Sequence, residues 1–421
     1  MFDVIVVGGG AAGFYGAIQM AKANPNLSIA ILERGKTVLS KVKISGGGRC
    51  NVTQGQFYVD EMTKGYPRGN KELLGPFYTH APSEVIAFFE EHGVSLKTES
   101  DGRVFPKSDS SQTVIDCFMD LTASLGIKVL RNSSVKNLTL QEDSTWRVTT
   151  MNKHYFAKKI LLASGSNARI WQMMQDLGHT IVEPVPSLFT LNIKDDRLKG
   201  IPGISTHASI SVPPKNVFVQ PSNLKLKSLP RKEPVLQEEG PVLITHWGLS
   251  GPAVLRLSAW GARILNEYKY NFKVLVNWTP EYTYESMSRY LNEVKEAEGK
   301  KTIARTKAVE MPQRLWMSLV NAAEIPKTQR WAEASKQQIL ALAEQLTRGS
   351  FRVEGKSTFK EEFVTAGGVD LKEVDFRTFA SKKLPNLYFA GEVLNIDGIT
   401  GGYNFQNAWT GAYIAAQAIA C

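Results

Sequence analysis

Glycine residues near the N-terminus are spaced for binding phosphate groups. Gly8, Gly10 and Gly13 form a G-x-G-x-x-G pattern directly after the apolar run at 1–7. In such a pattern the first glycine permits a tight turn, the second leaves room for a pyrophosphate, and the third permits close packing of a helix on a strand. The N–H groups that open the following helix attract the phosphates. Glu33 ends the next strand-like run, where an acid accepts hydrogen bonds from a ribose. The segment therefore predicts a βαβ dinucleotide-binding unit.

Two further segments favour FAD over NAD as the dinucleotide. One is the S-G-G-G-R-C-N run at 45–51. The other joins a strand-like run ending in Gly391 and Glu392 to the glycine pair Gly401 and Gly402. A strand that ends in a glycine and an acid, followed by a glycine pair that opens the last helix, is typical of FAD domains of the glutathione-reductase type. The start of that helix would stabilise the negative charge of a reduced flavin. We therefore expect tightly but non-covalently bound FAD.

The residues expected to contact FAD lie in separate segments of the chain. At 163–165 small residues let the backbone pass close to the cofactor, and the backbone of Val135 is placed to reach the adenine. The complete set is Gly8, Gly10, Ala12, Gly13, Glu33, Arg34, Lys43, Gly47, Arg49, Cys50, Asn51, Val135, Ala163, Ser164, Gly165, Gly391, Glu392, Gly402, Tyr403, Asn404 and Phe405.

Three residues are candidates for catalysis beside the flavin. Arg49 is an anion-binding candidate for the flavin N5 side, or else binds FAD phosphate. His246, before the turn at 248–252 that leads into a helix, could donate a proton near neutral pH or could hold the loop. Thr365 would line the opposite wall of the cavity. A redox-active Cys50 is disfavoured because no C-x-x-C partner exists, and no metal-binding pattern occurs.

The helices and strands that must position these residues can also be expected from the sequence. Their order predicts an α/β Rossmann-type FAD domain. We expect a loop-like region at 51–79 and a hairpin around Asp101 and Gly102. We expect helices at 82–92, 112–125 and 166–177, the first with Ser83 as N-cap, and strands at 128–130, 135–140, 146–150 and 160–162.

The middle of the chain predicts an inserted module. Short runs of β type occur at 188–193, 208–212, 217–220, 242–245 and 272–276, and the pattern becomes helical at 281–346. We therefore expect a discontinuous FAD domain at 1–187 plus 353–421. The insert at 188–352 would be β-rich and barrel-like at 188–278, and helical at 279–352.

The composition of the chain limits its expected cellular location and the kinds of partner that it could bind. The chain has 421 residues, of which 43% are hydrophobic, and no apolar run reaches the ~18 residues that span a bilayer. Without a signal peptide or a cysteine framework, we expect a cytoplasmic protein. The net charge of +10 fits scattered lysines, a substrate carboxylate or RNA. Basic clusters at 225–232 and 295–307 lack interleaved aromatics, so a small-molecule substrate is favoured and nucleic acid is disfavoured. No partner protein can be deduced.

The motifs together resemble a bacterial NAD(P)/FAD-dependent oxidoreductase family, of the aminoacetone oxidase and 3-dehydro-bile-acid reductase type. They include the T-H-W-G-L-S-G-P run at 245–252 and the T-A-G-G-V run at 365–369, and the resemblance covers essentially the full length. It implies a Rossmann-type FAD domain with an inserted barrel and helical subdomain, but little about the substrate. Asn395 departs from the aspartate often found in this family, so it receives no catalytic role.

Three functions compete at this stage. The first is hydride transfer at flavin N5 with a small organic substrate, either reducing a C=C bond or oxidising an amine. The second is RNA modification, and the third is non-enzymatic flavin binding or redox sensing. No second G-x-G-x-x-G pattern occurs, so either NAD(P)H docks transiently or the substrate supplies the electrons.

Overall fold

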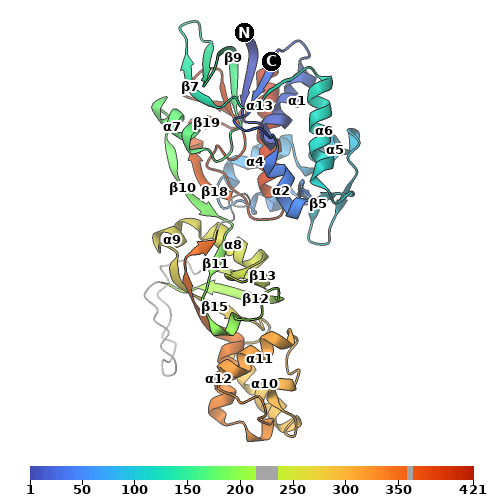
Figure 1. Cartoon of the computed structure of the whole chain (residues 1–421), viewed down its shortest axis with the longest axis vertical. Coiled ribbons are helices and arrows are strands. Elements are labelled where there is room, and N and C mark those ends of the chain that lie inside the picture. Colours follow the sequence, from blue (N-terminus) through green and yellow to red (C-terminus); the bar gives the residue numbers. More distant parts are fainter. Residues whose placement is uncertain (215–235, 358–363) are drawn as a thin grey trace. The chain divides into compact units, whose positions relative to one another are not determined.

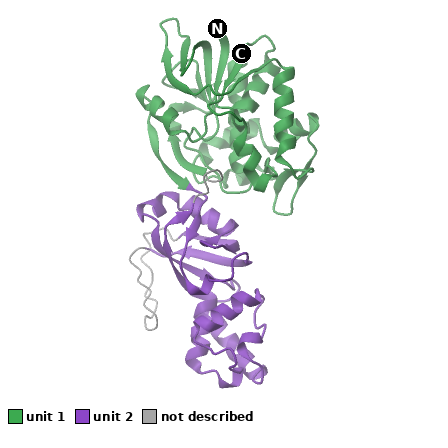
Figure 2. Ribbon diagram, in the orientation of Figure 1, with its two compact units in different colours: residues 1–186, 359–421 green, residues 187–358 purple. Residues whose placement is uncertain are grey.

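The chain forms two compact units, shown in Figures 1 and 2. The computed structural model describes residues 1–214, 236–357 and 364–421. Unit 1 comprises Met1–Pro186 and Phe359–Cys421, and unit 2 comprises Ser187–Thr358. The sequence-based insert at 188–352 lies inside unit 2. The predicted strand at 217–220 and the basic cluster at 225–232 lie outside the described residues.

A mainly parallel sheet forms the centre of unit 1. Its strand order is β6-β2-β1-β9-β21-β20-β19, and β7 and β8 pair antiparallel beside the first half of β9. A small sheet, β3-β5-β4, and the pair β10-β18 complete the strands. In chain order their bounds are β1 (Phe2–Val7), β2 (Ile29–Leu32), β3 (Thr53–Gln54), β4 (Leu96–Thr98), β5 (Arg103–Pro106), β6 (Lys128–Leu130), β7 (Val135–Leu140), β8 (Trp146–Thr150), β9 (His154–Leu162), β10 (Ile181–Ser187), β18 (Val364–Val369), β19 (Val374–Asp375), β20 (Ala380–Ser381) and β21 (Leu387–Phe389).

The register of the parallel strands brings distant motifs to one edge of the sheet. Val7 pairs with both Leu32 and Leu162, and Leu162 pairs with Phe389. The carboxyl ends of four strands therefore coincide, and such an edge is where open α/β sheets bind ligands. β2, most of β1 and the end of β9 at 160–162 are apolar and buried, as parallel strands covered on both faces require. The predicted Rossmann-type α/β fold is confirmed.

The helices of unit 1 include α2, α3 and α4, which sequence reasoning missed. The predicted loop at 51–79 is wrong, because it contains α3 and α4; Leu73 and Phe77 of α4 are fully buried. Ser83 is not an N-cap: α5 begins after Ala81, whose N–H donates to the Glu84 side chain at 2.8 Å. The hairpin of β4 and β5 is confirmed. The bounds are α1 (Ala11–Ala23), α2 (Ser40–Gly48), α3 (Val59–Thr63), α4 (Asn70–Thr79), α5 (Pro82–Glu91), α6 (Ser111–Ser124), α7 (Ala168–Asp176) and α13 (Tyr403–Ala420).

A β-barrel forms the first part of unit 2. Its strand order is β16-β15-β12-β13-β14-β11-β17, with bounds β11 (Thr190–Asn192), β12 (Ser205–Val212), β13 (Leu236–Ile244), β14 (Gly248–Ser250), β15 (Asn271–Asn277), β16 (Gly349–Glu354) and β17 (Lys356–Ser357). Only Gly355 separates β16 from β17. Its N–H donates to Tyr270 O, and its carbonyl accepts from Asn192 N–H. One bent strand thus joins both ends of the strand order and closes the sheet. The bend needs a φ of +104°, which favours glycine. The barrel-like prediction is confirmed.

Helices complete unit 2 and give it a core of its own. They are α8 (Pro252–Trp260), α9 (Ala262–Glu267), α10 (Tyr284–Ala297), α11 (Gln313–Ala322) and α12 (Lys336–Arg348). The amphipathic α10 and α12 pack together, and their apolar faces meet buried Trp316 and Trp331. The buried apolar residues of unit 2 form a cluster separate from that of unit 1.

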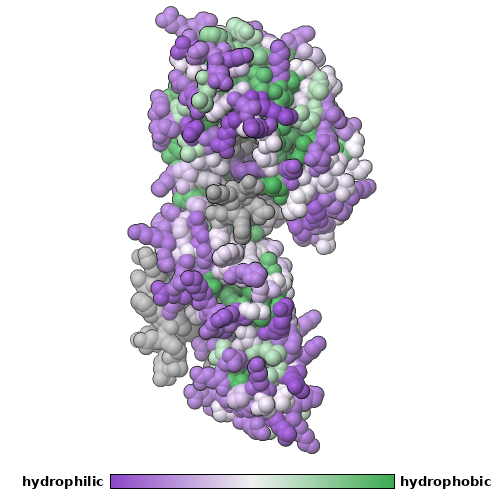
Figure 3. Space-filling model, viewed as in Figure 1, coloured by the Kyte–Doolittle hydropathy of each residue, from purple (hydrophilic) through white to green (hydrophobic). Residues whose placement is uncertain are grey.

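Polar side chains cover much of the viewed face of both units (Figure 3). Among the helices of the described residues, none is both long and apolar enough to cross a membrane.

Candidate functional site

The glycines after β1 form the turn that the sequence predicts. Gly8 has a φ of +118°, and a Cβ there would lie 2.4 Å from Ala163 O, while one at Gly13 would lie 2.0 Å from Gly8 O. Both positions therefore require glycine for close backbone approach. A Cβ at Gly10 would meet nothing within 4 Å. The backbone is thus tightly packed at Gly8 and Gly13, whereas the space beside Gly10 is open. A pyrophosphate needs such open space next to the backbone N–H groups at the start of a helix.

Glu33 ties the second strand to the glycine turn. Its carboxylate accepts hydrogen bonds from Gly9 N–H at 2.9 Å and Gly35 N–H at 2.7 Å. These bonds use one lone pair on each oxygen, so the carboxylate retains acceptor capacity toward a ribose.

A pocket lies at this edge of the sheet. Five of its lining residues are on the sequence-based list: Gly8, Glu33, Arg34, Val135 and Ser164. The other lining residues are Val7, Leu32, Ser133, Ser134, Asn167, Arg169 and Ile170. Sequence reasoning missed Asn167 and Arg169, although Asn167 is a recognisable N-cap of α7. The pocket joins the ends of β1, β2 and β9, which is where the sequence predicts the adenosine half of the dinucleotide.

The glycine-rich run at 45–51 is kinked, and hydrogen bonds to β3, to β5 and to the C-terminal motif hold its end in place. Gly46, Gly47 and Gly48 all have positive φ values, and a Cβ at Gly47 or Gly48 would meet nothing. Asn51 follows. With its amide oriented to satisfy its neighbours, it donates to Val104 O and Thr53 O and accepts from Gly402 N–H at 3.0 Å. The run at 45–51 and the C-terminal motif therefore touch.

Arg49 carries a paired rather than a free charge. Its guanidinium lies 2.7 Å from a Glu99 oxygen and 3.5 Å from Asp109, and it stacks 3.9 Å from the centre of the Phe105 ring. The hydrogen bond that Arg49 donates to the Glu99 carboxylate raises the pKa of Arg49. Its anion-binding role stays a prediction. Lys43 is exposed on α2, with its carbonyl accepting from Ser111 Oγ.

Cys50 is fully buried, and burial raises the pKa of its thiol to about 12. Thiol redox chemistry needs the thiolate. The residue has a positive φ of 62°, so it serves the turn between Arg49 and Asn51.

The C-terminal motif packs onto the N-terminal one. The Cβ that would replace a hydrogen of Gly391 lies 3.4 Å from the Ala12 Cβ, and one at Gly165 would lie 3.7 Å from a Glu392 oxygen. Glu392 also forms an ion pair with Lys41 at 2.6 Å. The small residues at 163–165 and 391 therefore let four segments converge.

The turn that opens α13 is fixed by side chains. Asn404 accepts from Gly398 N–H and donates to Gly398 O, both at 2.9 Å. Tyr66 donates its hydroxyl to Tyr403 O at 2.6 Å, and Phe405 stacks on Trp409. Gly402 has a φ of +97° and passes so close to Thr53 that no side chain fits. The helix start is thus rigid before any ligand arrives.

Several buried polar atoms near this turn have no partner in the protein. They include Gln54 Oε1, which faces Gly401, and Asn395 Oδ1. Buried polar groups are normally satisfied, so such atoms mark positions where a polar ligand is expected. Whether they face the flavin end of FAD stays a prediction, and Asn395 keeps no assigned catalytic role.

His246 and Thr365 belong to different units. His246 is exposed in the turn between β13 and β14, where Thr245 Oγ1 accepts from Trp247 N–H and Gly248 N–H. Thr365 is buried in β18. The catalytic roles of both stay predictions.

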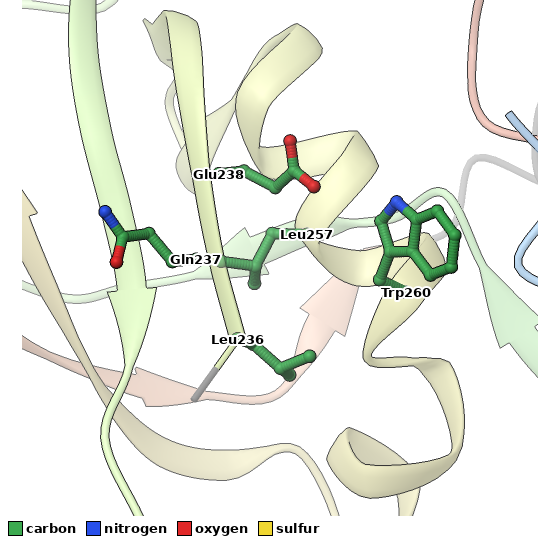
Figure 4. A pocket seen from close by; sticks show the side chains of 5 residues that line it. All are labelled: Leu236, Gln237, Glu238, Leu257 and Trp260. Carbon is green, nitrogen blue, oxygen red and sulfur yellow. The ribbon is translucent and has the colours of Figure 1, made fainter. Parts of the chain in front are cut away.

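A second pocket lies in unit 2 and holds none of the predicted site residues. It is lined by Leu236, Gln237, Glu238, Leu257 and Trp260, and Figure 4 shows these side chains around the start of β13 and along α8. Glu238 is already paired with Arg256 at 2.9 Å. This pocket offers no free group for redox chemistry.

The carboxyl ends of β1, β2, β9 and β21 form the edge of the sheet at which the dinucleotide is expected, here called the dinucleotide edge. This edge and the Rossmann-type fold define an FAD-dependent oxidoreductase. A family profile described as "HI0933-like protein Rossmann domain" matches residues 2–418, and the chain belongs to this family.

Similar proteins of known name cover nearly the whole chain. The chain is 29% identical to the ribosomal RNA dihydrouridine synthase of Escherichia coli K12 over 99% of this chain and 97% of that protein. It is 26% identical to the 3-dehydro-bile acid delta(4,6)-reductase of Clostridium scindens over 99% and 98%. The solved 3-ketosteroid-delta4-(5alpha)-dehydrogenase of Rhodococcus jostii RHA1 shares the fold, with a TM-score of 0.51, 13% identity, and coverage of 100% of this chain and 97% of that one.

Proposed function

We propose that this protein is an FAD-dependent reductase that saturates a C=C bond conjugated to a carbonyl, and that its substrate is a uridine in RNA. When bound and reduced by NAD(P)H, the FAD would supply the hydride from N5. The names of the two relatives described above support the reaction, because a dihydrouridine synthase and a delta(4,6)-reductase each add hydrogen across such a bond.

The distribution of charge carries the choice of RNA over a small molecule. Residues 187–358 contain 25 Lys and Arg against 16 Asp and Glu, a net charge of +9. The remaining residues contain 25 against 24, a net charge of +1. Scattered lysines would be shared between the units in proportion to length, whereas nearly all the excess lies in unit 2. A polyanion gains more from such a concentrated charge than a single small substrate does.

The residues of the chain would divide the work. The dinucleotide edge holds the adenosine and pyrophosphate, and the rigid turn at Gly402 aims its N–H groups at the flavin. His246, exposed on its hairpin, is the candidate proton donor to the carbon that does not receive the hydride. Electrons would come from NAD(P)H docking transiently on the flavin.

A second candidate is reduction of a small enone. It is favoured by the 26% identity to a bile-acid reductase over the full length of both proteins. In that case the excess positive charge of unit 2 would attract the carboxylate of the substrate.

One experiment separates the two. The purified protein, with FAD and NAD(P)H, is incubated with ribosomal RNA from a strain that lacks its gene, and the nucleosides are analysed by mass spectrometry. We expect dihydrouridine to appear only with protein and reductant. A parallel panel of steroid and other enones is followed by NAD(P)H oxidation. Turnover of an enone with no dihydrouridine in the RNA would overturn the RNA assignment.

A further inference from the structure

We propose that the helical part of unit 2 carries a docking surface for the sugar-phosphate backbone of folded RNA. The surface is formed by Lys300, Lys301, Arg305, Lys307, Arg314 and Arg330, here called the basic face. This inference rests on the proposed function for its biological meaning, but it concerns a surface built entirely within unit 2.

Hydrogen bonds bring the basic face together from three segments. The stretch at 300–307 lies beside Arg330, because Thr302 and Arg330 form a β-bridge and Trp331 N–H donates to Lys301 O at 3.1 Å. The same stretch lies against the start of α11, because Gln313 Nε2 donates to Ala304 O at 2.7 Å. The Trp316 indole also donates to Ile303 O. Residues far apart in sequence therefore share one region of the surface.

The charges of this face are available to a ligand. All six side chains are exposed. Within the described part of the chain, Lys301 is the one member that forms an ion pair, with Glu298 at 2.6 Å. Across 298–333 the sequence has seven basic residues against four acids, and Glu333 is engaged in part with Arg330 N–H. Hydrophilic residues cover much of the viewed face of this region (Figure 3).

The face lacks the features that single-stranded RNA requires. Trp316 and Trp331 are 2% and 0% exposed, so they form the support behind the charges and not a platform on which bases can stack. Cations without exposed aromatic rings contact phosphates and read the shape of a folded RNA. The basic face would thus hold a structured RNA in register and leave base recognition to other residues.

The test compares two triple variants of the full-length holoprotein. Arg305→Gln/Arg314→Gln/Arg330→Gln removes three charges from the basic face. Lys71→Gln/Lys107→Gln/Lys153→Gln removes three exposed charges from unit 1 and serves as the control. The probe is a fluorescent hairpin fragment of ribosomal RNA, and its Kd is measured by anisotropy over a range of salt concentrations.

We expect the first variant to bind the hairpin at least about tenfold more weakly, with the slope of log affinity against log salt reduced by about two to three. The control should behave like the wild type, and both should keep the wild-type rate of flavin reduction by NAD(P)H. Equal binding by the two variants would overturn the proposal. So would competition by polyglutamate as effective as that by RNA, because that result would indicate an acidic protein partner.

The outcome is distinguishable from that of the proposed function. Weakened binding without formation of dihydrouridine would leave the docking surface standing and remove the assigned reaction. Formation of dihydrouridine with unchanged binding would do the reverse.

Discussion

Glu33 acts at the scale of single residues in two ways, since it orders the glycine turn and faces the nucleotide pocket. Its oxygens accept from Gly9 and Gly35 N–H groups, and the residue lines the pocket at the ends of β1, β2 and β9. A ribose would add a charge-assisted bond worth roughly 1.5–3 kcal/mol. We predict that Glu33→Ala lowers FAD affinity about tenfold or more. Flavin fluorescence titration of the apoprotein measures the change.

The control for this prediction is Glu90→Ala, which removes an exposed acid from α5. Thermal unfolding of both apoproteins shows whether the domain remains folded. Wild-type FAD affinity in Glu33→Ala at matched stability would mean that the carboxylate serves the backbone alone.

His80 makes the stability of unit 1 dependent on pH. Its ring is buried, stacks on Tyr413 at 4.1 Å, and bonds the Tyr15 hydroxyl at 2.8 Å. Burial lowers its pKa from 6.5 to about 4. In the unfolded chain His80 therefore binds a proton below pH 6.5, whereas in the folded chain it stays neutral down to about pH 4. We predict that the contribution of His80 is constant above pH 6.5 and falls by about 3 kcal/mol toward pH 4.

Urea unfolding at a series of pH values tests this. His80→Phe keeps a ring against Tyr413 but cannot titrate, so its stability should fall less steeply between pH 6.5 and 4 than that of the wild type. Exposed His154, changed to Gln, is the control. Parallel curves for wild type and His80→Phe would show that another group dominates.

At the scale of elements, the hairpin of β13 and β14 presents His246 to solvent. The turn is closed by Thr245, whose N–H donates to Gly248 O at 2.8 Å, so the ring is carried on a rigid support. A general acid typically contributes ~10²–10⁴ to the rate. We predict that His246→Ala slows reoxidation of reduced flavin by substrate by that range and leaves FAD affinity unchanged. Stopped-flow absorbance measures the rate, with His207→Ala on the same barrel as control. Equal rates in the two variants would assign His246 to the loop alone.

The elements also show which parts of the fold could be predicted from the sequence. The strands β1 and β2 and the end of β9 at 160–162 are largely apolar runs, and local pattern suffices for them. The helix α4 contains Gly75 and Pro76, which favour a loop. Its formation depends on burial of Leu73 and Phe77 against distant residues, and tertiary packing overrides local propensity there.

The same reasoning applies to the site. The glycine turn, Glu33 and the C-terminal motif are local patterns, and the structure places them at one edge. The pairing of Arg49 with Glu99, the ion pair of Lys41 with Glu392, and the contact of Asn51 with Gly402 join segments remote in sequence. No periodicity or spacing could have predicted these pairs, and they decide whether a charge is free.

At the scale of the whole molecule, unit 2 enters and leaves unit 1 through paired strands. The chain departs along β10 and returns along β18, where a Cβ at Gly367 would lie 2.6 Å from Pro184 Cα. The two connections are therefore close together, and each unit has a separate apolar core. A short Gly-Ser linker could replace unit 2 without separating β10 from β18.

We predict that residues 1–186 joined by such a linker to 359–421 fold and bind FAD, because the dinucleotide edge and the turn at Gly402 lie wholly in unit 1. This protein should elute as a yellow species in gel filtration, and acid should release unmodified FAD from it. It should form no dihydrouridine, because the basic face and His246 are absent. The isolated unit 2 should bind the RNA hairpin with a salt-dependent Kd and no flavin. A colourless or aggregated unit 1 would show that unit 2 is needed for FAD binding, whereas RNA binding by unit 1 alone would place the RNA contacts outside the basic face.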